Sequence, residues 1–222
     1  MRKIIQTSTL FIFVFLSYQS LSASVYYWVG KSGNWNNAQN WSYSSGGNGG
    51  AGIPGTNDNV IFDNLSFDAS KNTVTVPSNV QMHDFNWNVT QFRPTLISYV
   101  PVNFELTGSY TVNGKLKNKI TGQLIFNSSA NSTIKTNGVH LIADIVKRSD
   151  NQLKLLDDIY LEGNAKIVLE EGELNTNSKN FRIYELVFET SLSKKLILDN
   201  SVCVFGNDFD PDRPDLIYSD IN

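Results

Sequence analysis

The chain has 222 residues, with 18 Lys or Arg against 21 Asp or Glu, so its formal net charge is −3. A mildly acidic surface is repelled by nucleic acid and by anionic membranes, which disfavours both as partners. The single cysteine, Cys203, excludes an intrachain disulfide. Cys203 lies in an apolar, strand-like run, which predicts a buried structural thiol rather than a reactive one.

Residues 1–23 have the order of a secretory signal. Arg2 and Lys3 precede the apolar run 10–16, and small or polar residues follow up to Ala23. The run is shorter than the roughly 20 apolar residues that a membrane span needs, so we expect cleavage near Ala23 and no stable span afterwards. An uncleaved anchor or a buried strand is the alternative. Cleavage lowers the basic count from 18 to 16 against 21 acidic residues, so the net charge becomes −5.

The next segment, residues 24–69, is rich in Trp and Gly. Trp28, Trp35 and Trp41 lie within fourteen positions, and a Gly- and Ser-rich loop follows from 44 to 52. Aromatic rings at this density bury large areas, and we predict that they close the N-terminal end of a sheet. If the three rings were exposed, they could instead stack on sugar rings, as carbohydrate-binding modules require.

Residues 70–206 contain short apolar or alternating runs separated by Asn, Gly, Ser, Asp and Lys, which is typical of strands and turns. The segment 133–138 resembles 173–178, forty positions later, and 156–164 resembles 198–207 with one residue inserted. Self-similarity at this spacing indicates a solenoid, with two stacked coils of roughly 20 residues per repeat. We therefore predict an all-β fold, a right-handed parallel β-helix with an aromatic N-terminal cap. An antiparallel β-sandwich is the alternative.

Three features follow from stacked coils. Asn side chains in successive turns should lie above one another and form amide ladders. Ile134 and Leu174 should point into the same core, two coils apart, with Lys135 and Asn175 pointing outward. The C-terminal strand edge should be uncapped, which favours self-association.

Residues 207–222 form an acidic tail or linker that contains two prolines. Asp208, Asp210 and Asp212 alternate along it, and such a loop suits Ca²⁺, a cation that takes six to eight oxygen ligands. The Gly and the distal Glu of an EF-hand are missing, so a solvated tail without any metal is the competing interpretation.

Catalytic patterns are weak. Asp144 with Lys147 and Arg148, or the pair Asp157 and Asp158, could supply the carboxylates and base of a polysaccharide lyase or hydrolase. Both groups equally suit strand ends and turns. His83 and His140 have no partner at ligand spacing, and no G-x-S-x-G motif occurs to support a serine hydrolase. We therefore assign no catalytic residue.

The first part of the mature chain carries the motifs YWVG at 27–30, SGNW at 32–35, NWS at 40–42, Pro54 and NDNVIFD at 57–63. With these motifs it resembles the opening of large secreted surface proteins of gliding Gram-negative bacteria. The resemblance implies a parallel β-helix, an adhesin-like role and a location outside the cell. Lys31 replaces a glycine of that pattern, and the chain reaches Asn222 without a C-terminal sorting domain, so it could be the opening piece of a longer protein.

Two functional classes remain open at this point. The first is a non-enzymatic structural or adhesin-like surface protein, with extracellular polysaccharide or other surface proteins as partners. The second is a carbohydrate-binding or polysaccharide-degrading protein. A cleft with converging carboxylates and a basic group would favour an enzyme, whereas a flank of Asn, Thr and Ser would favour adhesion.

Overall fold

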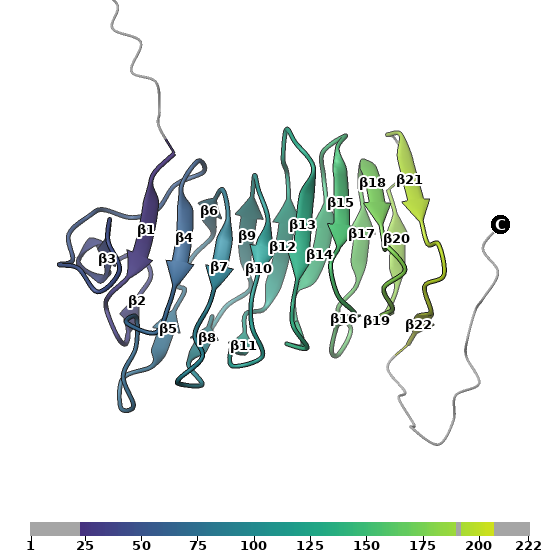
Figure 1. Cartoon of the computed structure of the whole chain (residues 1–222). Helices are drawn as coiled ribbons and strands as arrows, with labels where there is room; N and C mark the ends of the chain where they lie inside the picture. Colours follow the sequence, from purple (N-terminus) through teal and green to yellow (C-terminus); the bar gives the residue numbers. More distant parts are fainter. Residues whose placement is uncertain (1–22, 190–191, 207–222) are drawn as a thin grey trace, which may run out of the picture.

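The computed structural model describes residues 23–189 and 192–206. In these residues the chain forms a β-solenoid of about seven turns, and the strands lie side by side in an elongated stack from β1 to β22 (Figure 1). Every strand pair is parallel except the pair of β1 with β3, within the described part of the chain. The predicted parallel β-helix is therefore confirmed, and the antiparallel sandwich is wrong.

Three faces run along the stack, and from β4 onward successive coils visit them in the same order. Sheet A has nine strands and occupies one face: β1 (Val25–Trp28), β3 (Trp41–Ser42), β4 (Asn59–Phe62), β7 (Phe85–Trp87), β10 (Tyr110–Thr111), β13 (Ser132–Lys135), β15 (Gln152–Leu155), β18 (Gly172–Asn175) and β21 (Lys194–Ile197).

The second face is divided between two sheets. Sheet B serves the early coils and sheet D the later ones, with the isolated bridge between Leu141 and Leu161 continuing the face. The strands of sheet B are β2 (Gly33–Asn34), β5 (Thr73–Thr75), β8 (Thr95–Ile97) and β11 (Lys117–Lys119), and those of sheet D are β16 (Ile159–Tyr160), β19 (Phe181–Ile183) and β22 (Cys203–Phe205).

Sheet C forms the third face, with six strands. Along it, as along the other faces, inward side chains alternate with outward ones because successive residues of a strand point to opposite sides. Its strands are β6 (Val80–Met82), β9 (Val102–Leu106), β12 (Gly122–Phe126), β14 (Asp144–Lys147), β17 (Ile167–Leu169) and β20 (Leu186–Phe188).

The repeat length is 42 residues rather than 40. Ser132 pairs with Leu153, and Leu153 pairs with Leu174, at a step of 21 residues each. Ile134 and Leu174 are both fully buried and two coils apart, as predicted. However, Ile134 pairs with Leu155, whereas Leu174 pairs with Leu153, two residues before Leu155 on the same strand. The predicted core face is right, and the register is shifted by two residues.

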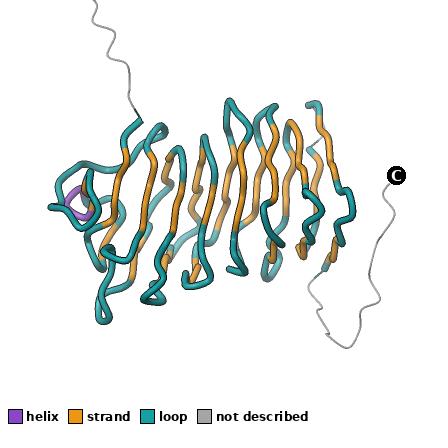
Figure 2. Tube along the Cα trace, viewed as in Figure 1, coloured by secondary structure: helices purple, strands orange, loops and turns teal. Residues whose placement is uncertain are grey.

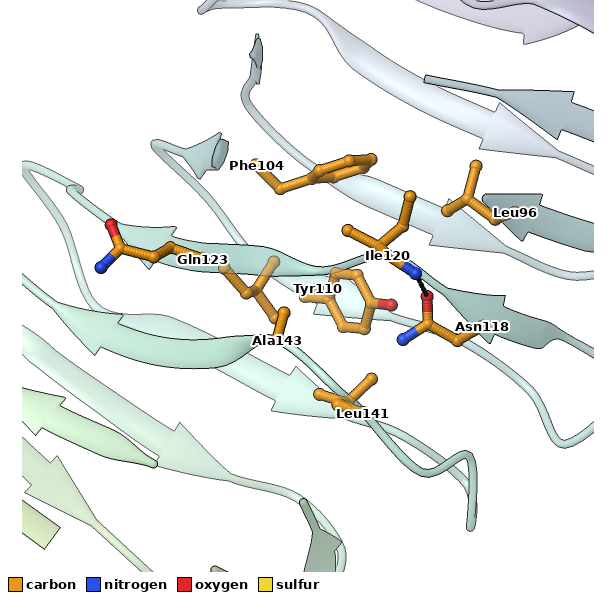
Figure 3. A pocket seen from close by; sticks show the side chains of 9 residues that line it. Leu96, Phe104, Tyr110, Asn118, Ile120, Gln123, Leu141 and Ala143 are labelled. Atoms are coloured by element: carbon orange, nitrogen blue, oxygen red, sulfur yellow. Dashed lines mark hydrogen bonds between the residues drawn. The ribbon is translucent and has the colours of Figure 1, made fainter. Parts of the chain in front are cut away.

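The core changes character along the stack. The first coils pack aromatic rings such as Trp28, Phe62, Phe85 and Trp87, whose centroids lie 4.4 to 6.2 Å apart in several pairs. Later coils are filled by Leu, Ile and Val. Between the two regions lies a small apolar cavity of about 20 Å³, lined by Phe104, Tyr110, Leu141 and other side chains (Figure 3). That space accepts about one water molecule and no larger ligand.

Turns at the end of sheet A are held by hydrogen bonds between coils. The Asn137 side chain donates to the Val112 carbonyl at 2.5 Å, and the Asn177 side chain donates to the Leu155 carbonyl at 3.2 Å. Asn137 and Asn177 have positive φ angles of 48° and 53°, a conformation that Asn tolerates better than most residues. The expected amide-to-amide ladder is therefore replaced here by amide-to-backbone bonds.

The N-terminal end is closed by the segment between β2 and β4. It contains a short 3₁₀ helix, η1 (Ala38–Asn40), which lies at that end of the stack beside β3 (Figure 2). Strand β1 pairs with β4 in sheet A, and β2 pairs with β5 in sheet B, so the Trp- and Gly-rich segment also contributes strands to the stack.

Candidate functional site

Trp28, Trp35 and Trp41 are all buried with 0 % of their surface exposed. The Trp41 ring packs edge-on against Trp28 at 5.0 Å and against Trp35 at 4.8 Å. The Trp41 Nε1 donates to the Trp35 carbonyl at 2.7 Å. Stacking on a sugar needs an open ring face, which none of the three rings has in this arrangement. The packing role that we preferred for them agrees with their positions.

The calcium candidates Asp208, Asp210 and Asp212 lie outside the described residues. Within residues 23–189 and 192–206, no group of three or more His, Cys, Asp or Glu side chains is placed to hold a metal ion. Cys203 is free and buried, as predicted, and burial raises the pKa of its thiol to about 11. A thiol with this pKa stays protonated at neutral pH and is a poor nucleophile.

The group Asp144, Lys147 and Arg148 does not converge. Asp144 accepts a hydrogen bond from the Lys166 backbone N–H at 3.0 Å, and Arg148 forms a two-bond ion pair with Glu170 at 2.6 and 2.9 Å. Lys147 turns inward instead: it is 1 % exposed and lies in register with the core residues of neighbouring coils. Neighbouring strand positions point to opposite sides, so adjacent residues in the sequence are separated here.

The pair Asp157 and Asp158 also has a structural role. Asp157 accepts hydrogen bonds from the backbone N–H groups of Thr136 and Asn137 in the preceding coil. Asp158 accepts from the Asn180 N–H at 2.9 Å in the following coil. Both carboxylates therefore connect turns along the stack.

Of the two histidines, His140 lies in the more suggestive surroundings. Its Nδ1 lies 2.5 Å from Glu162 Oε1, and its ring centroid lies 5.4 Å from that of Tyr160. Together with Arg182, these side chains line a hollow of about 260 Å³ over sheet D. His83, by contrast, contacts the Thr107 hydroxyl at 3.1 Å and lies 4.0 Å from Asp84.

The partnership of His140 with Glu162 escaped sequence reasoning, although the signal was present. The two residues are 22 positions apart, which is one coil of this solenoid. Tyr160 pairs with Arg182 at the same spacing. Our repeat of forty implied coils of 20 residues, and that error placed the wrong residues above one another.

Sheet C carries a second set of outward side chains. In one column Gln81 Nε2 donates to Glu105 Oε2 at 2.9 Å, and Asn127 Nδ2, from the neighbouring column, donates to Glu105 Oε1 at 2.8 Å. These two hydrogen bonds lower the pKa of the Glu105 carboxyl, with Asn127 contributing most. Gln81 pairs with Glu105, and in the following coils the same outward position is occupied by aliphatic residues. These are Ile125, Val146 and Val168, which form a separate buried cluster.

Comparison with models of known protein families, with curated proteins and with solved structures found no match. Among the described residues no helix is long and apolar enough to cross a membrane. The candidate function therefore depends on the fold and on the surfaces just described.

Proposed function

We propose that the protein is a non-enzymatic, adhesin-like structural protein that works outside the cell. The observation that carries the proposal is the continuous parallel stack, whose flanks present side chains in columns with one position per coil. An elongated repeating surface is complementary to an extended partner, and repeat proteins commonly bind along such surfaces. Extracellular polysaccharide or another surface protein is the partner we propose.

Two further features of the described flanks support this proposal. The carboxylates of Asp144, Asp157 and Asp158 are engaged by backbone N–H groups of neighbouring coils. The basic side chain of Arg148 is engaged by Glu170. Groups that are held in this way stabilise the stack and are not free to act on a substrate.

A binding experiment that also measures turnover tests the proposal. The protein is incubated with a panel of extracellular polysaccharides, and the bound fraction, new reducing ends and unsaturated products are measured together. We expect saturable binding without product formation. Product formation that scales with protein concentration would contradict a non-enzymatic role, and the absence of binding to polysaccharides and to isolated cell surfaces would contradict adhesion.

The extracellular location is part of the same proposal and has its own test. N-terminal sequencing of protein from the culture medium or the cell envelope should give a mature chain that begins within a few residues of Ser24. Mature protein that keeps residues 1–16 would contradict cleavage of the signal.

A polysaccharide lyase is the second candidate, and the hollow over sheet D is the observation that favours it. In such a reaction a base removes the proton beside a sugar carboxyl group, a C=C bond forms as the neighbouring C–O bond breaks, and an acid or water protonates the departing oxygen. His140 or Tyr160 could take the proton, and Arg182 could bind the carboxylate. If the panel gives unsaturated products, His140→Ala and Tyr160→Phe should each reduce their formation by at least about tenfold.

A further inference from the structure

A second hollow, of about 290 Å³, lies where the N-terminal closing segment meets sheet C; we call it the cap groove. Asn36, Ile53 and Pro54 line it from the closing segment. On the other side it is lined by Asn79 and by outward side chains of β6 and β9, among them Asn103. Its volume is near the lower end of ligand sites, which are roughly 300 to 1,000 Å³.

One polar side chain of the cap groove has unused hydrogen-bonding capacity. The Asn103 side-chain amide makes no hydrogen bond with any described residue, whereas the Asn103 backbone N–H donates to Asn79 Oδ1 at 2.9 Å. Trp35 also lines the groove, but its ring is 0 % exposed and its Nε1 is buried below the surface, so this N–H lies out of reach of a ligand in the groove.

One acceptor of the cap groove is fixed in place before any ligand arrives. Gln81 and Asn127 each donate to one oxygen of the Glu105 carboxylate, and the Thr56 hydroxyl in turn holds Gln81 at 3.0 Å. A carboxylate in this setting stays ionised and accepts further hydrogen bonds from hydroxyl groups. Such a rigid acceptor binds without the entropic cost of ordering its side chain.

From these features we infer that the cap groove binds a neutral, hydroxyl-rich glycan segment of roughly one or two sugar rings. Amide donors and acceptors beside one carboxylate match hydroxyl groups, which both donate and accept. Ile53 is 46 % exposed at the rim and offers an apolar surface for the C–H face of a sugar ring. No Lys or Arg is among the residues that line the groove, so a uronate or sulfated sugar finds no counter-charge there.

The inference rests on the proposed function in that it names the ligand class of an extracellular binding protein. Its test uses Asn103→Ala, with Asn86→Ala as the matched control. Asn86 is likewise a half-buried, outward-facing Asn on a strand, and its side chain makes no hydrogen bond with a described residue, but it lies on β7 of sheet A, away from the groove. Glu105→Gln serves as a second variant that keeps the shape of the side chain and removes the charge of the fixed acceptor.

Affinities are measured by titration calorimetry for neutral and for uronate-containing oligosaccharides. We expect Asn103→Ala to weaken neutral-glycan binding at least tenfold, Glu105→Gln to weaken it severalfold, and Asn86→Ala to leave it unchanged. Thermal unfolding of each variant checks that the fold is kept. Equal affinities for Asn103→Ala and Asn86→Ala, a preference for uronates, or no binding of any neutral glycan would each overturn the inference.

These outcomes are distinct from those of the proposed function. Glycan binding that Asn103→Ala leaves unchanged would remove the cap groove as the site and leave the adhesin-like role intact. Cleavage of a glycan that binds in the groove would do the reverse, because the site would stand and the non-enzymatic role would fall.

Discussion

Trp28 is one of the buried rings in the aromatic packing that closes the N-terminal end. Its ring centroid lies 5.0 Å from that of Trp41 and 5.9 Å from that of Phe62, and its Nε1 donates to the Lys31 carbonyl at 3.3 Å. Trp28→Ala should lower the free energy of unfolding by about 3–5 kcal/mol, because it opens a large cavity. Tyr99→Ala is the control, since Tyr99 is 79 % exposed and should cost less than about 0.5 kcal/mol. A loss below 1 kcal/mol for Trp28→Ala in urea unfolding would contradict the burial of this ring.

Lys147 is the one buried lysine of the described core, and it makes stability depend on pH. Burial lowers the pKa of its ammonium from 10.5 to about 8, against the opposing influence of Asp150 and Glu171. Its Nζ donates to the Ser149 carbonyl and hydroxyl. Between pH 8 and 10.5 the unfolded chain binds this proton more tightly than the folded chain, so stability rises with pH in that window.

Lys147→Met should remove this dependence. Relative to the variant, the wild-type protein should gain up to about 3 kcal/mol of unfolding free energy between pH 8 and pH 10.5. Below pH 8 the difference between the two proteins should be constant, because the lysine is then protonated in both states. Parallel stability curves across pH 8 to 10.5, from chemical denaturation at each pH, would contradict the lowered pKa.

At the scale of the element, corners between faces depend on glycine: Gly172 lies between sheets C and A, and Gly138 follows sheet A before the second face. Gly172 has a φ of 79°, and a Cβ there would lie 2.2 Å from the Ser149 carbonyl oxygen of the preceding coil. Gly138 has a φ of 77°, yet a Cβ there would meet nothing within 4 Å. The two positions share the backbone strain of a left-handed conformation and differ in the close approach of another coil.

Substitution by alanine separates the two effects. Gly138→Ala should cost about 1 kcal/mol from backbone strain alone. Gly172→Ala should cost at least about 2 kcal/mol more, because the corner must shift away from Ser149. Equal midpoints of denaturation for the two variants would show that the coils are less tightly apposed than described.

Strand positions and the inward face of each strand could be predicted from apolar alternation, because burial of every second residue is a local property. The residues that meet across coils could not be predicted, since they depend on a coil length that varies from turn to turn. Ile134 pairs with Leu155 at a spacing of 21, whereas Tyr110 pairs with Ile134 at 24. For this reason the contact of His140 with Glu162 was missed. Lys147 was grouped with Arg148 because the two are adjacent in the sequence, although neighbouring strand residues point to opposite sides.

At the scale of the whole molecule, the two ends differ. The N-terminal end is covered by β3 and the buried Trp41, whereas strands β20, β21 and β22 have no partner on their outer edges among the described residues. Phe188 on β20 is 47 % exposed, although it is in register with the buried Leu169. Unpaired edges with exposed apolar side chains favour pairing with another chain.

We therefore predict that the protein self-associates through this end. Sedimentation velocity should show an apparent mass that rises with protein concentration, and Phe188→Lys should suppress the rise. Val100→Lys is the control, because Val100 is 53 % exposed on a turn in the middle of the stack. A monomer at all concentrations, or equal effects of the two variants, would contradict association through the C-terminal end.

The parallel register of neighbouring coils is the central claim, because the hydrogen bonds between coils, the hollow over sheet D and the cap groove all depend on it. Thr133 pairs with Lys154, and Lys154 pairs with Asn175, on the outward side of β13, β15 and β18. Cysteines at directly paired positions lie about 5 Å apart, within reach of a disulfide, whereas positions two coils apart lie about 10 Å apart and beyond it.

Disulfide trapping in a Cys203→Ala background tests this register most directly. Mild oxidation should cross-link the pair Thr133→Cys with Lys154→Cys and the pair Lys154→Cys with Asn175→Cys within one chain, as measured by thiol counting and mass spectrometry of proteolytic fragments. The pair Thr133→Cys with Asn175→Cys should remain reduced. Cross-linking of that last pair as fast as the adjacent pairs, or none in any pair, would contradict the coil-on-coil stack.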